Sequence, residues 1–308
     1  MHKTPFRLTI LGSSGAMPTS KRLTSAQLLK HSNRLFLLDC SEGTQILMKR
    51  LKIPLMKINH IFISHLHGDH YLGLPGLLFT MHLLGRNNEL NIYSPPGLKK
   101  IIEIQFDICN LKTSYEITFH EIEQGGSVIY NDPTIKIETI EMSHSIPTYG
   151  FLFSEKPLER NIKKKYVDKY DIPVDQILQI KAGSSYTTPK GEVLANEELT
   201  ITPPQPRSYA FCSDTSYTEK FIDQINGVDM IYHEATFMKD FAETAKEKHH
   251  STTTEAATIA LKAGAKKLLV GHYSARYDNN TLKHYLKEAR DIFPNTLLAE
   301  EGKVFEVK

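Results

Sequence analysis

The order of apolar and polar residues along the chain predicts a β-rich first part. Strand-like apolar runs cover residues 6–11, 25–30 and 35–39, with a short polar turn between the last two. The run 58–64 is apolar on successive residues, which is typical of a strand that is covered on both faces. These runs predict a sheet with a buried strand at 58–64.

Helical spacing begins after this buried run. Apolar side chains recur at helical intervals from Leu74 to Leu84, and Gly85 follows as a stop signal. A second helix is predicted after Thr252, because Thr252-Thr253-Thr254-Glu255 fits a capping box and Gly264 follows the apolar run. Strands that alternate with helices favour an α/β fold. Further strands are predicted at 134–142, 209–213, 228–232 and 268–271.

Residues 155–206 differ from the rest of the chain. Lysine and arginine are concentrated between 156 and 181, where there are seven of them against four acidic residues. Prolines recur through the segment, and its apolar periodicity is weak. We therefore interpret residues 1–308 as a single domain into which a flexible arm at about 155–200 is inserted. Taken alone, such a segment is more often a solvated lobe than an RNA clamp.

Composition narrows the class of protein. The chain has 308 residues, 40% hydrophobic and 23% charged, which excludes a disordered, collagen-like or disulfide-scaffold protein. A net charge of +2 gives no global attraction to nucleic acid, so such a partner requires a local patch. Three widely spaced cysteines suit a reducing compartment. No apolar run approaches the roughly 20 residues of a membrane span, and the first residues lack a leader pattern, so we expect a cytoplasmic protein without a membrane partner.

The strongest chemical signal is the sequence His65-Leu66-His67-Gly68-Asp69-His70, directly after the buried run. Three imidazoles and one carboxylate are thereby expected at the carboxyl edge of the sheet, where α/β folds place their sites. Imidazole and carboxylate ligands without thiolate are typical of catalytic zinc. The alternative is a polar loop with three incidental histidines, which the specificity of the pattern disfavours.

These four side chains cannot all face one ion, so further ligands are expected at other strand ends. His144, Asp214 and His272 each follow a predicted strand. Each of them alone is more often a cap or a turn residue. Their equivalent positions in the topology favour a shared metal site.

The motif Ser64–His70 resembles the metallo-β-lactamase superfamily, and within it the chain is similar to the ribonuclease Z family of tRNA 3′-processing endonucleases. The similarity runs from about residue 6 to the C-terminus. The His-Glu-Ala-Thr and His-Ser-Thr motifs narrow the resemblance from the superfamily to this family. The segments that carry it are Asp39-Cys40-Ser41-Glu42-Gly43-Thr44-Gln45, Gly73-Leu74-Pro75-Gly76-Leu77-Leu78, His233-Glu234-Ala235-Thr236-Phe237, His250-Ser251-Thr252-Thr253 and Gly271-His272-Tyr273-Ser274-Ala275-Arg276-Tyr277.

The resemblance implies a fold and a metal centre. The fold is an αββα sandwich of the metallo-β-lactamase type with a protruding tRNA-binding arm. Two zinc ions per subunit are implied, with Asp214 as the residue that bridges them. The ligands implied are His65, His67 and His144 for one ion, and Asp69, His70 and His272 for the other.

The resemblance also implies roles in catalysis. Asp69 is the proton acceptor that orients the attacking water, and His250 is the general acid, held by Glu234, which raises the imidazole pKa. Otherwise His249 and His250 are a pair of helix N-terminal residues, where a cationic imidazole is disfavoured. That cost favours a functional role for them. Asp39 either holds a ligand histidine or makes a strand-end turn.

The activity implied is removal of the 3′ trailer from precursor tRNA by a zinc-dependent endoribonuclease that works as a homodimer. The tRNA is left with a 3′-hydroxyl and the trailer with a 5′-phosphate. The arm at about 155–200 matches the position of the family's tRNA-gripping arm. Two features depart from the family pattern. The loop Pro18–Leu23 is shorter and lacks an asparagine, which puts the sparing of CCA-ending tRNA in doubt, and the arm lacks a Gly-Pro element.

Two other functions stay open. An enzyme with the same metals could act on another substrate, as a phosphodiesterase or an ester, lactone or thioester hydrolase. The basic arm and the His-Glu-Ala-Thr and His-Ser-Thr motifs argue against this alternative. A non-enzymatic RNA-binding or scaffold relative would have lost metal ligands, whereas all seven positions are filled here.

Overall fold

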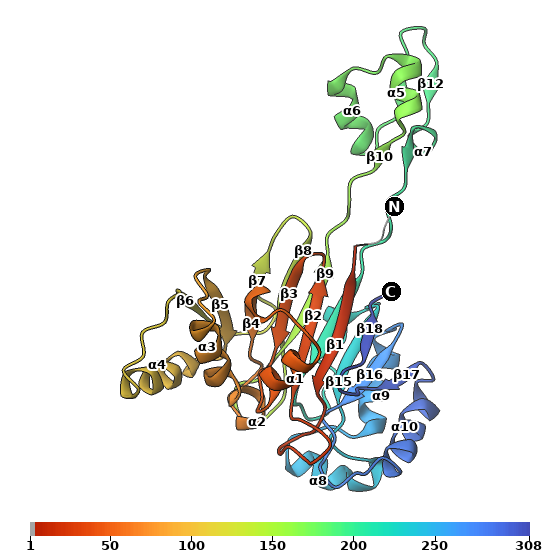
Figure 1. Cartoon of the computed structure of the whole chain (residues 1–308). Coiled ribbons are helices and arrows are strands. Elements are labelled where there is room, and N and C mark those ends of the chain that lie inside the picture. Colours follow the sequence, from red (N-terminus) through yellow and green to blue (C-terminus); the bar gives the residue numbers. More distant parts are fainter. Residues whose placement is uncertain (1–3) are drawn as a thin grey trace. The chain divides into compact units, whose positions relative to one another are not determined.

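Two seven-stranded β-sheets form the centre of the structure, a computed structural model that describes residues 4–308 (Figure 1). The first three residues, on which the expectation of no leader partly rests, lie outside the described residues. The strands of sheet 1 are β1 (Phe6–Gly12), β2 (Ala26–His31), β3 (Arg34–Leu38), β4 (Ile58–Phe62), β5 (Leu90–Ser94), β6 (Ile117–Glu121) and β18 (Val304–Glu306). Those of sheet 2 are β7 (Val128–Asn131), β8 (Ile135–Glu141), β9 (Tyr149–Glu155), β14 (Ser208–Cys212), β15 (Met230–Glu234), β16 (Leu268–Gly271) and β17 (Thr296–Leu298).

The order of the strands brings the parallel ones together. Sheet 1 has the order β18-β1-β2-β3-β4-β5-β6, and sheet 2 has the order β17-β16-β15-β14-β9-β8-β7. Strands β3 to β6 are parallel, and so are β14 to β17. Parallel neighbours end at the same edge of a sheet, so each sheet has one edge onto which several strands direct their following loops.

The two sheets pack face to face through aromatic side chains. The ring of Phe62 in β4 lies 5.3 Å from that of Phe151 and 5.8 Å from that of Phe153, both in β9. The Tyr209 hydroxyl in β14 donates a hydrogen bond to Oε1 of Gln27 in β2. The alternation of β1 places Phe6, Leu8 and Ile10 in this interior without exposure.

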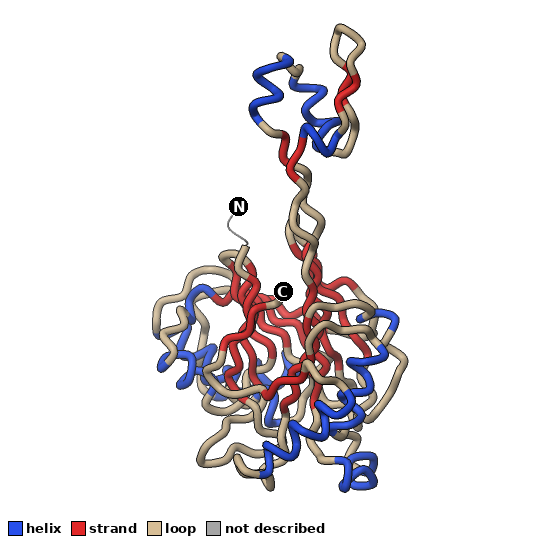
Figure 2. Tube along the Cα trace, turned by 90° about the vertical axis from the view of Figure 1, so that its right-hand side faces the viewer, coloured by secondary structure: helices blue, strands red, loops and turns tan. Residues whose placement is uncertain are grey.

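Helices cover the outer face of each sheet (Figures 1 and 2), which confirms the expected αββα sandwich. The helices of this sandwich are α1 (Thr44–Arg50), α2 (Gly68–Tyr71), α3 (Leu74–Leu83), α4 (Leu98–Ile108), α8 (Ala242–Glu247), α9 (Thr253–Lys262) and α10 (Thr281–Ile292), with short 3₁₀ helices at Leu55–Lys57, Asp223–Ile225 and Lys239–Phe241. Apolar residues of α1, α3 and α4 pack on sheet 1, and those of α9 and α10 pack on sheet 2.

Both predicted helices end where local sequence signals place their ends. Helix α3 stops before Gly85, which adopts a φ of 75° that suits glycine. The Thr252 side chain accepts a hydrogen bond from the N–H of Glu255, whose carboxylate accepts from the N–H of Thr252, so the predicted capping box is present at α9. Gly264, with a φ of 59°, follows α9.

The described chain divides into two compact units. Unit 1 comprises the residues up to Tyr130, Ile137–Phe153 and Ser208–Lys308, and unit 2 comprises Asn131–Lys136 and Ser154–Arg207. No helix among residues 4–308 has the length and apolar character that crossing a membrane requires.

Unit 2 has a small core of its own, which the weak apolar periodicity of this segment did not predict. Ile172, Ile180, Tyr186, Leu194 and Leu199 are buried together. Each comes from a short element or a turn, so no long helical or strand period develops along the sequence. The elements are β10 (Asn161–Ile162), α5 (Lys164–Tyr170), α6 (Val174–Lys181), β11 (Tyr186–Thr187), β12 (Val193–Leu194), α7 (Asn196–Leu199) and β13 (Thr200–Ile201).

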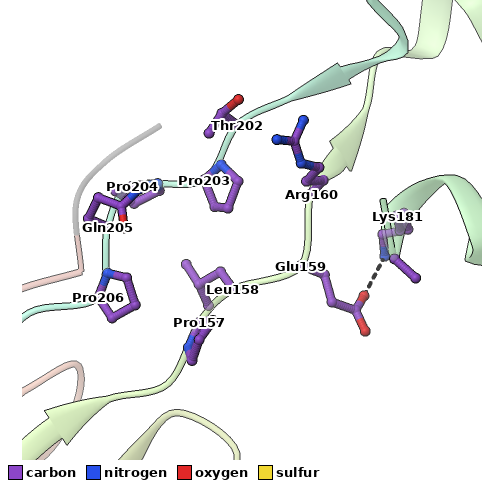
Figure 3. Close-up of a pocket in the computed structure, with 11 residues that line it drawn as sticks. Pro157, Leu158, Glu159, Arg160, Lys181, Thr202, Pro203, Pro204, Gln205 and Pro206 are labelled. Carbon is purple, nitrogen blue, oxygen red and sulfur yellow. Dashed lines mark ion pairs between the residues drawn. The ribbon is translucent and has the colours of Figure 1, made fainter. Parts of the chain in front are cut away.

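Proline-rich segments lead into and out of these elements. Pro157, Pro203, Pro204 and Pro206 line a cavity of about 480 Å³ within unit 2 (Figure 3). A Lys181–Glu159 ion pair of 3.2 Å lies at the same cavity. Because proline has no N–H for a ladder hydrogen bond, strand pairing between the two segments is limited to β10 and β13.

Candidate metal centre

Seven histidine and aspartate side chains meet at the carboxyl edges of the two sheets. They are His65, His67, Asp69, His70, His144, Asp214 and His272, the set predicted from the sequence. The two edges coincide, because the Tyr149 N–H of sheet 2 donates to the Ser64 carbonyl that follows β4, at 3.0 Å. Loops after β4, β8, β14 and β16 therefore converge on one place.

The first group of donor atoms consists of three histidine nitrogens. Nδ1 of His67 lies 3.1 Å from Nε2 of His65 and 3.2 Å from Nε2 of His144. Burial lowers the pKa of all three rings, most strongly that of the fully buried His65. Neutral imidazoles keep a lone pair, which is the form that binds a metal.

The second group combines one carboxylate with two histidines. Oδ2 of Asp69 lies 3.4 Å from Nε2 of His70 and 3.3 Å from Nε2 of His272. Burial favours the neutral form of Asp69, but the two histidines outweigh it and hold the pKa of this carboxyl below its usual value. The carboxylate is therefore ionised and available as a ligand.

Asp214 contacts both groups. Its Oδ2 lies 3.7 Å from Nε2 of His65 and 3.4 Å from Nε2 of His70, and its Oδ1 lies 3.3 Å from Nε2 of His272. A buried carboxylate between two histidine groups has the position of a ligand shared by two ions.

Two buried polar atoms without hydrogen-bond partners in the described part of the chain indicate that these residues fit a metal. Nε2 of His70 and Oδ1 of Asp214 are buried and have no hydrogen-bond partner within residues 4–308. An unsatisfied buried polar atom is costly, so such atoms call for an ion or a solvent molecule. The donors are imidazoles and carboxylates, which suit divalent transition metals. The residues therefore fit metal ions. The geometry also brings Asp214, His250 and His272 together, but Nδ1 of His250 is engaged by Glu234.

Second partners orient the ligand histidines through the ring nitrogens that face away from the centre. Nδ1 of His70 lies 2.7 Å from Oδ2 of Asp39, and Nδ1 of His272 lies 2.8 Å from Oγ1 of Thr236. Asp39 fulfils both expectations for it, because it also has a turn-like φ of 55°. Nδ1 of His144 is held 2.8 Å from the carbonyl oxygen of His249.

Sequence reasoning missed the roles of Thr236, His249 and Ala16. The Thr236 hydroxyl could have been found, because it lies two residues beyond β15 at the same sheet edge. The contributions of His249 and Ala16 are made by backbone atoms, which leave no signal in the side-chain pattern. The Ala16 N–H donates to Oδ2 of Asp69 at 2.8 Å.

Glu234 and His250 form a pair next to the metal ligands. Nδ1 of His250 lies 3.0 Å from Oε1 of Glu234, which is fully buried. Burial alone would lower the pKa of His250, but the Glu234 carboxylate, supported by Asp214, raises it to about 9. The imidazole is therefore protonated at neutral pH and carries a proton that it can give.

The alternative interpretation of His249 and His250 as helix N-terminal residues is wrong. The His249 N–H donates to the Lys246 carbonyl at 3.2 Å, and the His250 N–H donates to the Ala245 carbonyl at 2.8 Å. With His249 at a φ of 56°, these bonds form a Schellman motif at the C-terminus of α8. A cation is favoured at the C-terminus of α8, and His250 lies outside α9, two residues before its N-cap Thr252, so its position relative to the helices gives no argument for a function.

Glu234 also holds several loops together. It accepts five hydrogen bonds, from the backbone N–H groups of Thr215, Thr236 and Ser251, the Thr236 hydroxyl and the His250 ring. Because the Thr236 hydroxyl also contacts the ring of His272, Glu234 links a metal ligand to His250.

Replacement of Glu234 by Gln is expected to lower the free energy of unfolding by about 1–3 kcal/mol, because an amide NH₂ group would face N–H donors that now have an acceptor. Urea titration of both proteins measures the difference. Glu243→Gln, at an exposed position of α8, is the control and is expected to change stability by less than about 0.5 kcal/mol. Equal stability of the two variants would contradict the linking role of Glu234.

The metal ligands open onto a cavity of about 530 Å³. Glu247, Lys248 and His249, at the end of α8, line it together with Asp214 and His250. The cavity exposes both groups of ligands and the protonated imidazole to one bound molecule. This arrangement suits hydrolysis of an ester or a phosphodiester that lies across the two ligand groups.

The fold and its metal-ligand edge define the class of protein. The crystal structure of the metallo-β-lactamase fold protein YhfI from Bacillus subtilis superposes on the chain with a TM-score of 0.69, at 20% identity, over 99% of this chain and 100% of that one. The chain thus has the metallo-β-lactamase fold.

Similarity along the whole chain identifies the family. The ribonuclease Z of Bacteroides fragilis (strain YCH46) is 44% identical over 96% of this chain and 97% of its own length. The crystal structure of human tRNase Z, short form (ELAC1), has a TM-score of 0.73 and 25% identity, and covers 98% of this chain and 99% of its own. A family model described as "Anti-Pycsar protein Apyc1" matches residues 6–162. The chain belongs to the ribonuclease Z family.

Proposed function

We propose that the chain is a dizinc endoribonuclease that removes the 3′ trailer from precursor tRNA. The observation that carries this proposal is the pair of ligand groups that share Asp214 at the open edge of the sandwich. The names of the relatives, ribonuclease Z and tRNase Z, support tRNA as the substrate.

Each of the two ligand groups would hold one ion. His65, His67 and His144 would hold one ion, while Asp69, His70 and His272 would hold the other. Asp214 would contact both. When bound, two zinc ions supply Lewis-acid stabilisation of the phosphate oxygens and make a water acidic enough to attack at neutral pH.

Asp69 is proposed to orient the attacking water and to accept its proton. Its carboxylate lines the cavity and is fixed by the hydrogen bond from the Ala16 N–H. Because the pKa of this carboxyl is held below its usual value, Asp69 is ionised before the reaction and releases the accepted proton to solvent in the cavity.

His250 is proposed to protonate the leaving 3′-oxygen of the tRNA sugar. The bond between phosphorus and that oxygen breaks, the tRNA gains a 3′-hydroxyl and the phosphate stays on the 5′ end of the trailer. Glu234 acts through His250, since it fixes the ring and keeps the proton on it. A positioned acid of this kind typically contributes about 10²–10⁴ to the rate.

His250→Ala is expected to lower kcat for precursor cleavage by about 10²–10⁴ while RNA affinity changes little. The matched variant His249→Ala is expected to keep most activity, because the hydrogen bond that His249 makes to the ring of His144 comes from its backbone carbonyl, which alanine keeps. Since a raised pKa means that the proton is lost as pH rises through about 9, kcat of the wild type should fall above that pH. Single-turnover cleavage across a pH series measures both effects. Equal impairment of the two variants would refute the acid assignment.

Unit 2 is proposed to bind the tRNA. Lys165 lies 4.8 Å from the ring centroid of Tyr166, and Lys169 lies 4.6 Å from that of Tyr170, so α5 presents a basic and aromatic surface. Segment 154–207 as a whole has nine basic and eight acidic residues, so the charge excess belongs to residues 156–181. Such a stripe supplies phosphate contacts, which dominate affinity for nucleic acids.

Cut-site mapping on one precursor tRNA, with and without an encoded CCA, tests the proposal. Cleavage at the 3′ end that leaves a 5′-phosphate on the trailer, with about two zinc ions per chain, is the expected result. The comparison of the two precursors also shows whether CCA-ending tRNA is spared.

We further propose that the enzyme is a homodimer like its relatives, and sedimentation at several protein concentrations checks the assembly. Hydrolysis of small esters without precursor cleavage would favour a different hydrolase.

A further inference from the structure

A second cavity, of about 350 Å³, lies on the face of sheet 1 that carries Arg7 and Thr9. All of its charged lining residues are basic, namely Arg7, Lys30, Lys52 and Lys57. Its remaining lining is largely apolar and includes no aromatic residue. We call this cavity the basic groove.

The charges of the basic groove are poorly compensated. Arg7 pairs with Glu306 at 2.5 Å, whereas Lys30, Lys52 and Lys57 form no ion pair with any residue in the range 4–308. Arg7 and Lys30 are direct cross-strand neighbours in the register of β1 and β2. Like charges opposite one another destabilise a sheet; Glu306, the partner of Arg7 on β18, offsets this repulsion at Arg7, whereas Lys30 has no acidic partner in the range 4–308.

The groove and the metal centre lie at opposite ends of the same strands. Lys57 directly precedes β4 and His65 follows it, while Arg7 lies at the start of β1. At about 3.3 Å per residue, the eight residues from Lys57 to His65, through β4, span on the order of 25 Å. A single phosphodiester cannot reach both places, but a polynucleotide can.

We propose that the basic groove binds the phosphate backbone of the RNA substrate at a distance from the cut. The inference rests on the proposed function, in which the substrate is RNA. Lysine and arginine contact phosphate oxygens, and an anionic backbone compensates the unpaired cations. Because no aromatic side chain in the lining can stack on a base, the contact is independent of sequence.

The triple variant Lys30→Gln, Lys52→Gln and Lys57→Gln tests the inference. Each phosphate contact contributes about 0.7–0.9 to the slope of log K against log salt, so the slope for precursor tRNA is expected to fall by about 2–3. Affinity at low salt is expected to fall at least about tenfold. Hydrolysis of a small chromogenic phosphodiester is expected to stay unchanged, because that substrate cannot reach the groove.

The control is the triple variant Lys100→Gln, Lys112→Gln and Lys220→Gln, which removes the same charge from exposed positions elsewhere in unit 1. An equal loss of affinity in both triple variants would show a general charge effect and overturn the inference. So would an unchanged salt slope in the groove variant while the wild type cleaves precursor tRNA. Failure of the wild type itself to bind or cleave precursor tRNA would instead overturn the proposed function, and the inference with it.

Stability gives a second readout that does not depend on RNA. Lys30→Gln removes the like-charge pair with Arg7, so its melting temperature is expected to equal or exceed that of the wild type. A lower melting temperature would show that Lys30 stabilises the sheet. It would contradict the inference that Lys30 serves to bind a phosphate group. The double variant Lys52→Gln and Lys57→Gln leaves β1 and β2 untouched and is expected to lower the salt slope by about 1.4–1.8.

Discussion

Asp214→Ala is expected to abolish hydrolysis of every substrate while the chain stays folded. Its carboxylate contacts His65, His70 and His272, so its loss would leave two cations facing one another without a shared anion. Activity should fall well beyond the roughly 10–100-fold that is lost when only an outer partner of a ligand is removed. His67→Ala is expected to have a comparable effect, since its ring is one of three nitrogens of the first group.

Metal analysis and circular dichroism measure this result together with the activity. Asp229→Asn is the matched control, because Asp229 is also a buried aspartate but pairs with Lys266, away from the metal centre. It is expected to keep the zinc content of the wild type. Normal zinc content and activity in Asp214→Ala would refute the ligand assignment.

Replacement of residues 158–196 by a short Gly/Ser linker is expected to separate RNA binding from chemistry. All seven proposed metal ligands and the His250–Glu234 pair lie outside this span, so both zinc ions should stay bound. Tight binding of precursor tRNA and its cleavage should be lost with six of the seven basic residues of 156–181, and only the salt dependence of the basic groove should remain. Hydrolysis of a small chromogenic phosphodiester should continue at the rate of the wild type.

Filter binding across a salt series, with cleavage assays on both substrates, measures this separation. The variant Lys163→Gln, Lys165→Gln and Lys169→Gln keeps the core of unit 2 and is expected to lower the salt slope by about 2–3. Unchanged cleavage of precursor tRNA by the linker protein would mean that the segment is a solvated lobe. Loss of both activities with zinc and fold intact would place the segment in the active site. It would contradict the separation of RNA binding from chemistry.

Several parts of the structure could be predicted because their signals are local. The motif from His65 to His70 follows one strand, and His144, Asp214 and His272 each follow another. An α/β sheet brings such strand ends to one edge whatever the details of packing. The end of α3 and the capping box of α9 are likewise set by neighbouring residues. Helices α4 and α10 were not predicted, although both pack an apolar face on a sheet.

The sequence by itself determined which residues are the candidate metal ligands and that the fold is α/β, because strand ends and clusters of histidine and aspartate can both be recognised in short motifs. Only the tertiary structure shows which donor atoms lie together, since Asp214 contacts both groups through residues up to 149 positions apart. It also decided that His249 and His250 end α8 and that a backbone carbonyl orients His144. The basic groove is also a feature that only the tertiary structure decided. Its cations come from β1, β2 and the segment before β4, and only the pairing of these strands brings their charges together.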